Sequence, residues 1–251
     1  QTVVFDDSGL EASLNFLRNR SDQNLQEVIV AAGNKFAYDH YLWSHYGTKM
    51  SEAEFWSEQL SGILWSAEFE HSISSVQKYL WKQEKTKWLN EVLRYLPRRH
   101  FFNATLYLNL GYDHVVFNEN VALNLNSRQF GVEKRESVYY LIHELAHAGY
   151  VRYHSLPKLW GAKTNRELVP IVRFLTHLEG MGVLSALRLR IAEHGLLDND
   201  YKVLLDDAER TKRVRQYFKL LTQLENNPDK KVEEPVGQIY DKMSGGKTRL
   251  W

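Results

Sequence analysis

The residues best suited to chemistry are two histidines and a glutamate within residues 139–150. His143, Glu144 and His147 form the pattern His-Glu-x-x-His. Residues four positions apart share one face of a helix, so both histidines can present a ring nitrogen to one ion. Zn²⁺ accepts imidazole nitrogen, and a catalytic zinc site needs three protein ligands plus a water. The spacing predicts a helical site for one zinc ion, with Glu144 beside it to take a proton from the attacking water.

The apolar setting of this pattern strengthens the prediction. Chance would place a His-Glu-x-x-His in a chain of this composition roughly 3% of the time. Leu141, Ile142, Leu145 and Ala146 flank the histidines, and polar groups in such an apolar helix are costly unless something pairs them. Two plainer interpretations stay open: histidines that hold no metal, and a structural rather than catalytic zinc.

A third ligand must come from elsewhere in the chain. The next helix is predicted from about residue 164 to residue 193, and Glu179 lies inside it, followed by Gly180 and Gly182. Each glycine costs about 1 kcal/mol in a helix interior relative to alanine, and it permits close approach of another backbone. Glu179 is therefore the predicted third ligand, and an ordinary exposed or salt-bridged glutamate is the alternative.

Three other residues compete with Glu179 for this role. Glu167 follows His147 by twenty residues, but acidic residues are common at a helix start because they complement the macrodipole. His177 lies two residues from Glu179 and so points to a different side of the helix. His154 does not fit the metzincin pattern, which requires a glycine and a third histidine at fixed offsets.

Composition excludes several classes of protein. The 251 residues carry a formal charge of only +1, with 32 Lys and Arg against 31 Asp and Glu, which argues against a nucleic-acid binder. The apolar stretches are shorter than the roughly 20 residues of a membrane-spanning helix. Cysteine is absent, so any metal must be held by nitrogen and oxygen. Its absence slightly favours the cytoplasm over secretion.

The first hundred residues are predicted to be helical. Helices are expected over residues 8–20, 51–69 and 74–95; Ser-x-x-Glu capping boxes open the first two, and Pro97 ends the third. Trp81 is expected to face inward in the third helix. The lysines of that region are interpreted as a solvated helix face, because glutamates are interspersed among them.

A small sheet is predicted after these helices. Residues 104–110 and 121–126 alternate between apolar and polar side chains, which is typical of strands. Gly111 and Gly131 are expected to break the chain, with a long helix resuming near Val132. No linker composition marks a boundary, so we expect one domain over residues 1–251. Its fold class would be α+β, predominantly α, with a helical part to residue 100 and a catalytic part after it.

Over residues 104–195, these motifs resemble the gluzincin zinc peptidases, which carry His-Glu-x-x-His on one helix and a glutamate ligand on a later one. The resemblance implies a zincin-like core, the ligands His143, His147 and Glu179, and Glu144 as general base. Glu179 with Gly180 is similar to the Glu-Gly setting of the aminopeptidase-like branches. The thermolysin branch places its glutamate where Glu167 falls, but its downstream Asp would coincide with Ile171.

The same resemblance implies two further features. Gluzincins have a substrate-binding edge strand shortly before the metal helix, and residues 121–126 are similarly placed. They also supply a Tyr or His from beyond the glutamate helix to stabilise the oxyanion. Tyr217 and Tyr240 are the candidates, although each is also interpreted as a core tyrosine. The chain starts at Gln1 rather than Met and stops at Trp251, so we expect that it is processed or truncated.

The function expected from the sequence is zinc-dependent hydrolysis of peptide bonds, with a peptide or protein as substrate. A second hypothesis is a protein that binds metal without proteolytic activity and uses its groove to hold a partner. A zinc hydrolase acting on other substrates is a third. No nucleic acid and no membrane span are expected, and the oligomeric state stays open.

Overall fold

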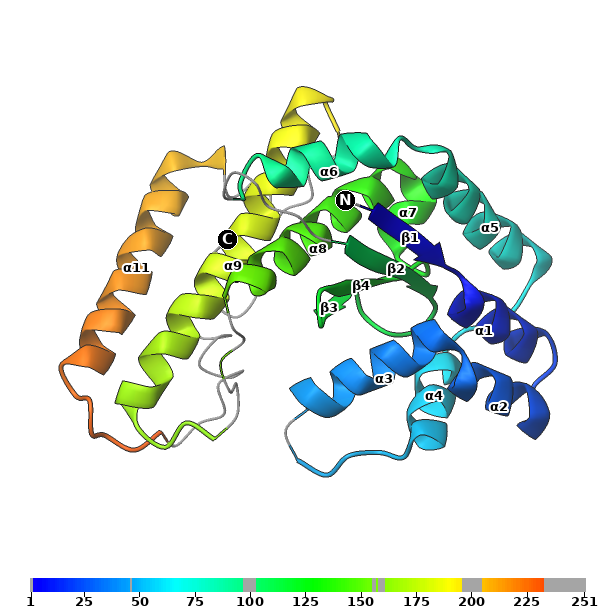
Figure 1. Ribbon diagram of the computed structural model, residues 1–251, viewed down its shortest axis with the longest axis horizontal. Helices are drawn as coiled ribbons and strands as arrows, with labels where there is room; N and C mark the ends of the chain where they lie inside the picture. Colours follow the sequence, from blue (N-terminus) through cyan, green and yellow to red (C-terminus); the bar gives the residue numbers. More distant parts are fainter. Residues whose placement is uncertain are drawn as a thin grey trace. The chain divides into compact units, whose positions relative to one another are not determined.

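The computed structural model describes residues 2–45, 47–96, 103–154, 157, 161–195 and 205–232. The chain divides into two compact units, residues 1–152 and 153–251 (Figure 1). The expected class is confirmed at the level of a mostly helical α+β fold with a small four-stranded mixed sheet. That the two units form one domain stays a prediction.

The sheet belongs to the first unit and has the strand order β1-β2-β4-β3. Strands β1 and β4 run parallel to β2, and β3 runs antiparallel to β4. The two predicted strands are confirmed as β2 and β4, whereas β1 and β3 were not predicted. The strands are β1 (Thr2–Asp6), β2 (Asn103–Asn109), β3 (Val115–Phe117) and β4 (Asn120–Asn124).

The predicted edge strand is not at the edge. Strand β4 lies between β2 and β3, so the short strand β3 forms that edge of the sheet. Asn118 and Glu119 join β3 to β4 with φ angles of 47° and 66°, as in a two-residue type I′ hairpin. The usual Asn-Gly signal of such a hairpin is missing here, which is why the sequence did not reveal β3.

Eight helices of the first unit are described. Near the start lie α1 (Ser8–Arg18), α2 (Asp22–Val30), α3 (Ala32–Ser44) and α4 (Glu52–Ser61). Further along are α5 (Ala67–Lys82), α6 (Lys85–Leu93), α7 (Arg128–Val132) and α8 (Arg135–Tyr153).

One of the two predicted capping boxes forms. At α4 the Ser51 side chain accepts from the Glu54 N–H while the Glu54 carboxylate accepts from the Ser51 N–H. At α1 the prediction is wrong, because Asp7 is the N-cap and Ser8 is already helical. The Ser8 hydroxyl instead donates to Asp6, so the side-chain capping bond is not made.

Two predicted helices are each broken in the structure. The helix expected over residues 51–69 ends at Ser61, and α5 starts after Ser66, whose side chain accepts from the Phe69 N–H. The helix expected over residues 74–95 is interrupted between α5 and α6. The inward prediction for Trp81 is wrong: it lies inside α5, ahead of the break, and is 52% exposed, because the buried side of that helix carries Ile73, Val76 and Leu80.

The predicted break at Gly111 is confirmed, and the one at Gly131 is wrong. Gly111 follows β2 with a φ of 86°, and a Cβ there would lie 2.7 Å from the Gln59 carbonyl oxygen. Gly131 lies inside the short helix α7. The long helix expected from Val132 begins at Arg135.

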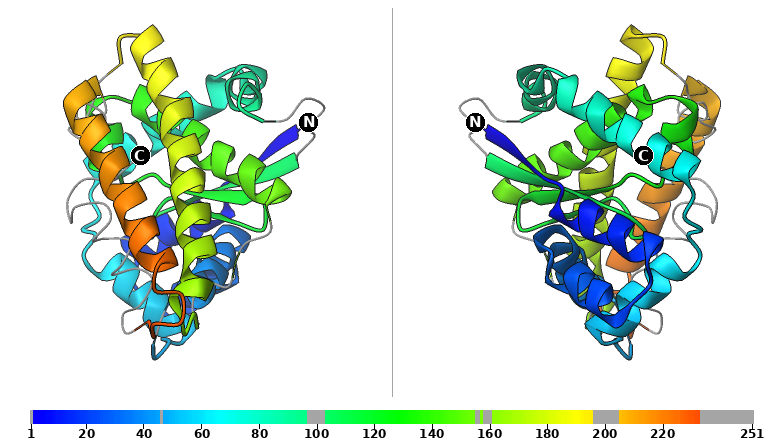
Figure 2. Two further views of the ribbon diagram at one scale, coloured as in Figure 1. Left: turned by 90° about the vertical axis from the view of Figure 1, so that its left-hand side faces the viewer. Right: turned by 90° about the vertical axis from the view of Figure 1, so that its right-hand side faces the viewer.

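Helices cover both faces of the sheet (Figures 1 and 2). On one face, the Phe36 ring of α3 lies 4.9 Å from the Tyr107 ring of β2 between centroids. On the other face, Trp88 of α6 lies 6.2 Å from Phe5 of β1. Leu106 and Leu108 of β2 are fully buried, so the core runs through the middle of the sheet.

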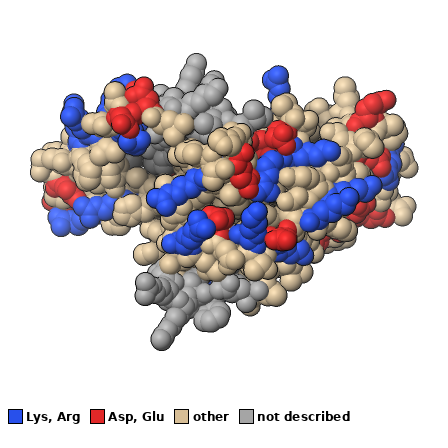
Figure 3. Space-filling model, turned by 90° about the horizontal axis from the view of Figure 1, so that it is seen from above, with Lys and Arg blue, Asp and Glu red and all other residues tan. Residues whose placement is uncertain are grey.

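The lysine-rich segment that joins α5 to α6 is a solvated face, as interpreted from the sequence. Lys82, Lys85 and Lys87 are exposed, and Glu91 pairs with Arg94 at 3.3 Å. Figure 3 shows Lys and Arg side chains interspersed with Asp and Glu on one face of the molecule. This mixture of charges gives no continuous basic surface on the face in view.

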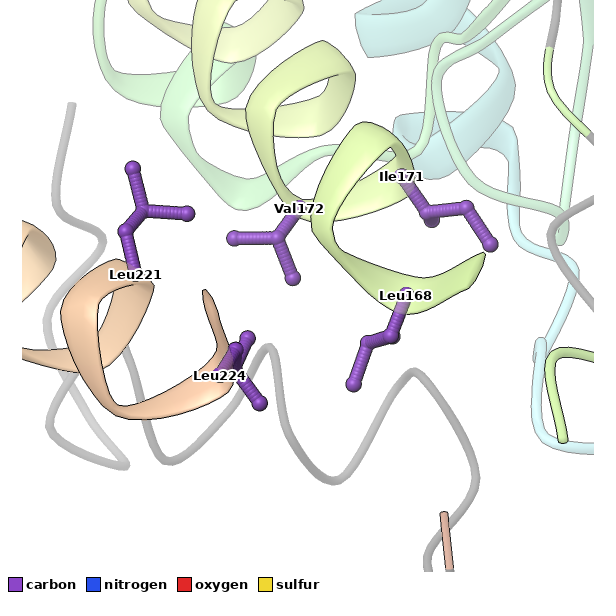
Figure 4. Packing of buried hydrophobic residues seen from close by; sticks show 5 residues of the cluster. All are labelled: Leu168, Ile171, Val172, Leu221 and Leu224. Carbon is purple, nitrogen blue, oxygen red and sulfur yellow. The ribbon is translucent and has the colours of Figure 1, made fainter. Parts of the chain in front are cut away.

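The second unit contains α9 (Asn165–Ala192) and α11 (Asp207–Glu225). The predicted bounds of the glutamate helix are confirmed by α9, which starts after the N-cap Thr164. The start of α9 packs against the end of α11 (Figure 4). The buried cluster between them consists of Leu168, Ile171, Val172, Leu221 and Leu224.

Helix α9 is long and apolar enough, by length and composition, to cross a membrane. Of its most apolar 18-residue window, 39% is buried, and core helices of water-soluble proteins meet the same criteria. The absence of a membrane span therefore stays a prediction.

Candidate metal centre

Helix α8 holds the predicted site and is buried on almost every side. From residue 136 to residue 149 every residue except Tyr140 is buried. Gly149 shows how tight the surroundings are, because a Cβ there would lie 2.5 Å from Cδ1 of Leu96. Near the helix end, Arg152 pairs with Glu119 of the β3–β4 turn at 2.6 Å. These contacts fix the helix against the rest of the first unit.

The three predicted residues of α8 come together. His143, Glu144 and His147 each offer a ligand atom, and these atoms lie within 4.8 Å of one another. Their exposed fractions are 6%, 7% and 6%. The two imidazole rings lie 4.4 Å apart between centroids. Two buried, convergent ring nitrogens fit a divalent ion such as Zn²⁺, and the Glu144 carboxylate lies beside them.

Glu144 is held in its charged form. Burial by itself would raise the pKa of this carboxyl group. His147 opposes this effect of burial through a hydrogen bond and through its charge, and its Nδ1 lies 3.5 Å from Oε2 of Glu144. The charges of His143 and His114 act in the same direction as His147. These interactions lower the pKa of Glu144 to about 2. At neutral pH it is a carboxylate, which is the form that can accept a proton.

Two further histidines of the first unit interact electrostatically with Glu144, and neither is predicted from the sequence: His114 acts on the Glu144 carboxyl group, and Glu144 acts on His40. His114 lies between β2 and β3, and His40 belongs to α3. Nδ1 of His40 lies 3.1 Å from the hydroxyl of Tyr112. Desolvation lowers the pKa of His40 to about 4, although the charges of Glu144 and Asp113 oppose that shift. His40 is therefore neutral at physiological pH.

The local hydrogen bonds explain how His114 is positioned. The backbone N–H of Asn124, at the end of β4, donates to Nδ1 of His114 at 3.2 Å. The side-chain oxygen of the same Asn124 accepts from the N–H of Gly111 at 3.3 Å and from that of Asn126 at 3.0 Å. One asparagine thus holds both the turn after β2 and the histidine that follows it.

The predicted third ligand lies on α9, in the second unit. Glu179 is half-buried, and the positions of the two units relative to one another are not determined. Its role as a ligand stays a prediction. Glu167 is exposed, and its carboxylate accepts from the N–H of Lys163 at 2.6 Å, as expected of a residue at a helix start. His177 and His154 are exposed.

Of the two tyrosines considered for the oxyanion, Tyr217 is described. It is half-buried and packs against the hydrophobic cluster of α9 and α11. Burial raises its pKa, while the positive charge of Arg173 and a hydrogen bond with Thr176 oppose the shift. This position agrees with the interpretation as a packing residue. Tyr240, Pro97 and the chain end at Trp251 lie outside the described residues.

No sequence signal singles out His40 or His114. Each is a lone histidine, and in the sequence the nearest metal-site histidine, His143, is 29 residues beyond His114. The hairpin that brings His114 to Asn124 has no Asn-Gly dipeptide. A histidine next to a predicted strand would have been the only hint.

Comparisons with protein-family models, curated proteins and solved structures gave no match to this chain. The candidate centre therefore stands on its own residues and their geometry.

Proposed function

We propose that this protein is a zinc-dependent peptidase with a zincin-like core, in which α8 is the metal helix. The observation that carries the proposal is the buried group His143, Glu144 and His147, with ligand atoms within 4.8 Å of one another. Taking two imidazoles and a carboxylate out of water is costly unless they pair with one another or with an ion. The gluzincin resemblance supports Glu179 as the remaining protein ligand.

Each residue has a distinct task in this proposal. His143 and His147 hold the ion through ring nitrogens. A bound Zn²⁺ supplies Lewis-acid chemistry, polarising a carbonyl oxygen and acidifying water. Glu144 accepts a proton from the water that adds to the carbonyl carbon. It then delivers that proton to the amide nitrogen as the carbon–nitrogen bond breaks, so that water is consumed and Glu144 is regenerated.

The test compares wild type with Glu144→Gln, using casein as substrate and measuring zinc in both. Glutamine keeps the size of the side chain but cannot accept a proton. We expect about one zinc per chain in both proteins, and casein hydrolysis reduced by about 10²–10⁴-fold in the variant, as for loss of a general base. Glu58→Gln, at an exposed position of α4, is the matched control and should cleave as wild type does.

Three results would contradict the proposal. If the wild-type protein bound no zinc, the proposed metal centre would be wrong. If wild type and Glu144→Gln cleaved casein equally well, the assignment of Glu144 as general base would be wrong. Zinc in wild type with no cleavage of casein or of a peptide library would favour the second hypothesis, a metal-containing binding protein.

A further inference from the structure

His114 is held by contacts that come from three separate segments of the first unit. Its ring lies 5.4 Å from the Phe130 ring of α7 and 4.9 Å from the Tyr140 ring of α8, measured between centroids. The backbone N–H of Asn124 donates to its Nδ1 at 3.2 Å. Ring packing and a hydrogen bond together limit the orientations that this side chain can adopt.

The hydrogen bond from Asn124 also decides where the proton of a neutral His114 sits. A backbone N–H can only donate, so Nδ1 of His114 must present a lone pair. A neutral imidazole has a single proton, which is therefore on Nε2. The Nε2–H is then a donor at the end of the ring away from Asn124.

This tautomer separates His114 from the two histidines of α8. A metal ligand needs a bare ring nitrogen, and in neutral His114 the bare nitrogen already accepts from the Asn124 N–H. His114 is also outside the described group of convergent ligand atoms, which is His143, Glu144 and His147. His114 is therefore suited to donate a hydrogen bond and not to bind the ion.

His114 contacts the face of α8 that carries the proposed general base. The Tyr140 ring that it packs against precedes Glu144 by four residues on α8, and residues four apart lie on one face of a helix. His114 acts electrostatically on the Glu144 carboxylate. It also immediately precedes β3, the edge strand, along which an extended peptide could add as a further strand.

We propose that His114 is a catalytic residue whose Nε2–H donates a hydrogen bond to the carbonyl oxygen of the peptide bond that is cleaved. This inference rests on the proposed peptidase function. The oxygen gains negative charge when water adds to the carbonyl carbon, so a fixed donor binds it more tightly in the transition state than in the ground state. His114 thus takes the part for which the sequence offered Tyr217 and Tyr240.

His40 is less suited to the same task. Its Nδ1 faces the Tyr112 hydroxyl at 3.1 Å, and a hydroxyl can either donate or accept. That contact does not fix which ring nitrogen of His40 carries the proton. In neutral His114, by contrast, the hydrogen bond from the Asn124 backbone N–H places the proton on Nε2.

The kinetic test uses three substitutions. His114→Phe keeps a ring between Phe130 and Tyr140 but removes both nitrogens, and it should lower kcat by about 10²–10³-fold with little change in KM or zinc content. His114→Gln can accept from Asn124 and donate through its amide, so it should stay within about tenfold of wild type. His71→Phe, on the exposed side of α5, is the matched control and should be unchanged.

A second readout does not depend on turnover. Nitrogen-15 spectra of histidine-labelled protein, assigned by the signals lost in His114→Phe, should show a bare Nδ1 and a protonated Nε2. In zinc-loaded Glu144→Gln, a bound peptide should shift the Nε2–H signal of His114. A proton on Nδ1 would overturn the proposal, as would a bound peptide that leaves the signal in place.

The outcomes separate this inference from the function on which it rests. If wild type cleaves peptides, Glu144→Gln does not, and His114→Phe retains the wild-type kcat, the role of His114 is wrong and the peptidase stands. If wild type cleaves no peptide, both the peptidase function and the role of His114 are wrong. A merely structural His114 would lower the melting temperature in the Phe and Gln variants without a selective loss of kcat in the Phe variant.

Discussion

Helices α8 and α9 carry the residues of the proposed centre in very different surroundings. Helix α8 is buried almost all round, whereas α9 is buried along one side and exposes Leu184 by 41% and Ile191 by 48%. A buried polar side chain must find a partner, and the three polar side chains of α8 converge within the first unit, whereas Glu179 belongs to α9 in the second unit. The histidines of α8 therefore constrain the function more strongly than Glu179 of α9.

The largest effect expected from this difference concerns the metal itself. Replacing both His143 and His147 with alanine should remove two of the three protein ligands and weaken zinc binding by more than about a hundredfold. His177→Ala, at an exposed position of α9, is the matched control and should keep its zinc. Zinc content after dialysis against a weak chelator checks both, and full zinc in the double variant would exclude α8 as the metal helix.

The second largest effect tests whether α9 contributes a ligand to the zinc ion. Glu179→Gln should lose most of its zinc on mild dialysis, because a ligand carboxylate supplies both charge and a bond of about 2.0–2.2 Å. Glu167→Gln should keep zinc and lose about 0.3–1 kcal/mol of stability, since its carboxylate acts at the helix start. If only Glu167→Gln released zinc, the thermolysin-like spacing would replace the Glu-Gly assignment.

A third effect uses the pH dependence of stability in metal-free protein. The pKa of His40 is lowered from 6.5 to about 4 in the folded state, so between these values the unfolded chain binds more protons. Stability should then fall as pH drops from 6.5 towards 4, by roughly 3 kcal/mol for this residue alone. Urea denaturation across that range should show a shallower slope for His40→Gln, and an identical slope would mean that His40 titrates normally.

The smallest effect measures how tightly α8 is packed. Gly149→Ala would bring a Cβ to 2.5 Å from Leu96 and force that side chain to move, so we expect a net loss of about 1 kcal/mol. Gly131→Ala in α7 meets nothing within 4 Å and should instead gain up to about 1 kcal/mol from helix propensity. Unfolding midpoints in urea give both values. A Gly149→Ala variant more stable than wild type would show that the packing around Gly149 can accommodate a methyl group.

The sequence predicted those parts of the fold that depend on local patterns. The alternation in β2 and β4, the glycine turn at Gly111, the Ser51 capping box and the start of α9 at Thr164 all have local causes. The spacing of His143 and His147 also sufficed to bring their side chains together, because a single helix sets it.

The missed features depend on contacts between distant segments. Strand β1 exists because Thr2–Asp6 pairs with a strand about a hundred residues later. His114 reaches the site through its bond to Asn124 across a hairpin whose turn has an unusual sequence. His40 lies near Glu144 because α3 packs on the sheet. Periodicity contains no information on such pairings.

The central claim is that one zinc ion is bound by α8, and anomalous scattering at the zinc absorption edge tests it most directly. Crystals of the zinc-loaded protein should show one strong anomalous peak at about 2.0–2.1 Å from a ring nitrogen of His143 and of His147, with a carboxylate as the third protein ligand. A peak away from α8, or none in protein that contains zinc, would contradict the account.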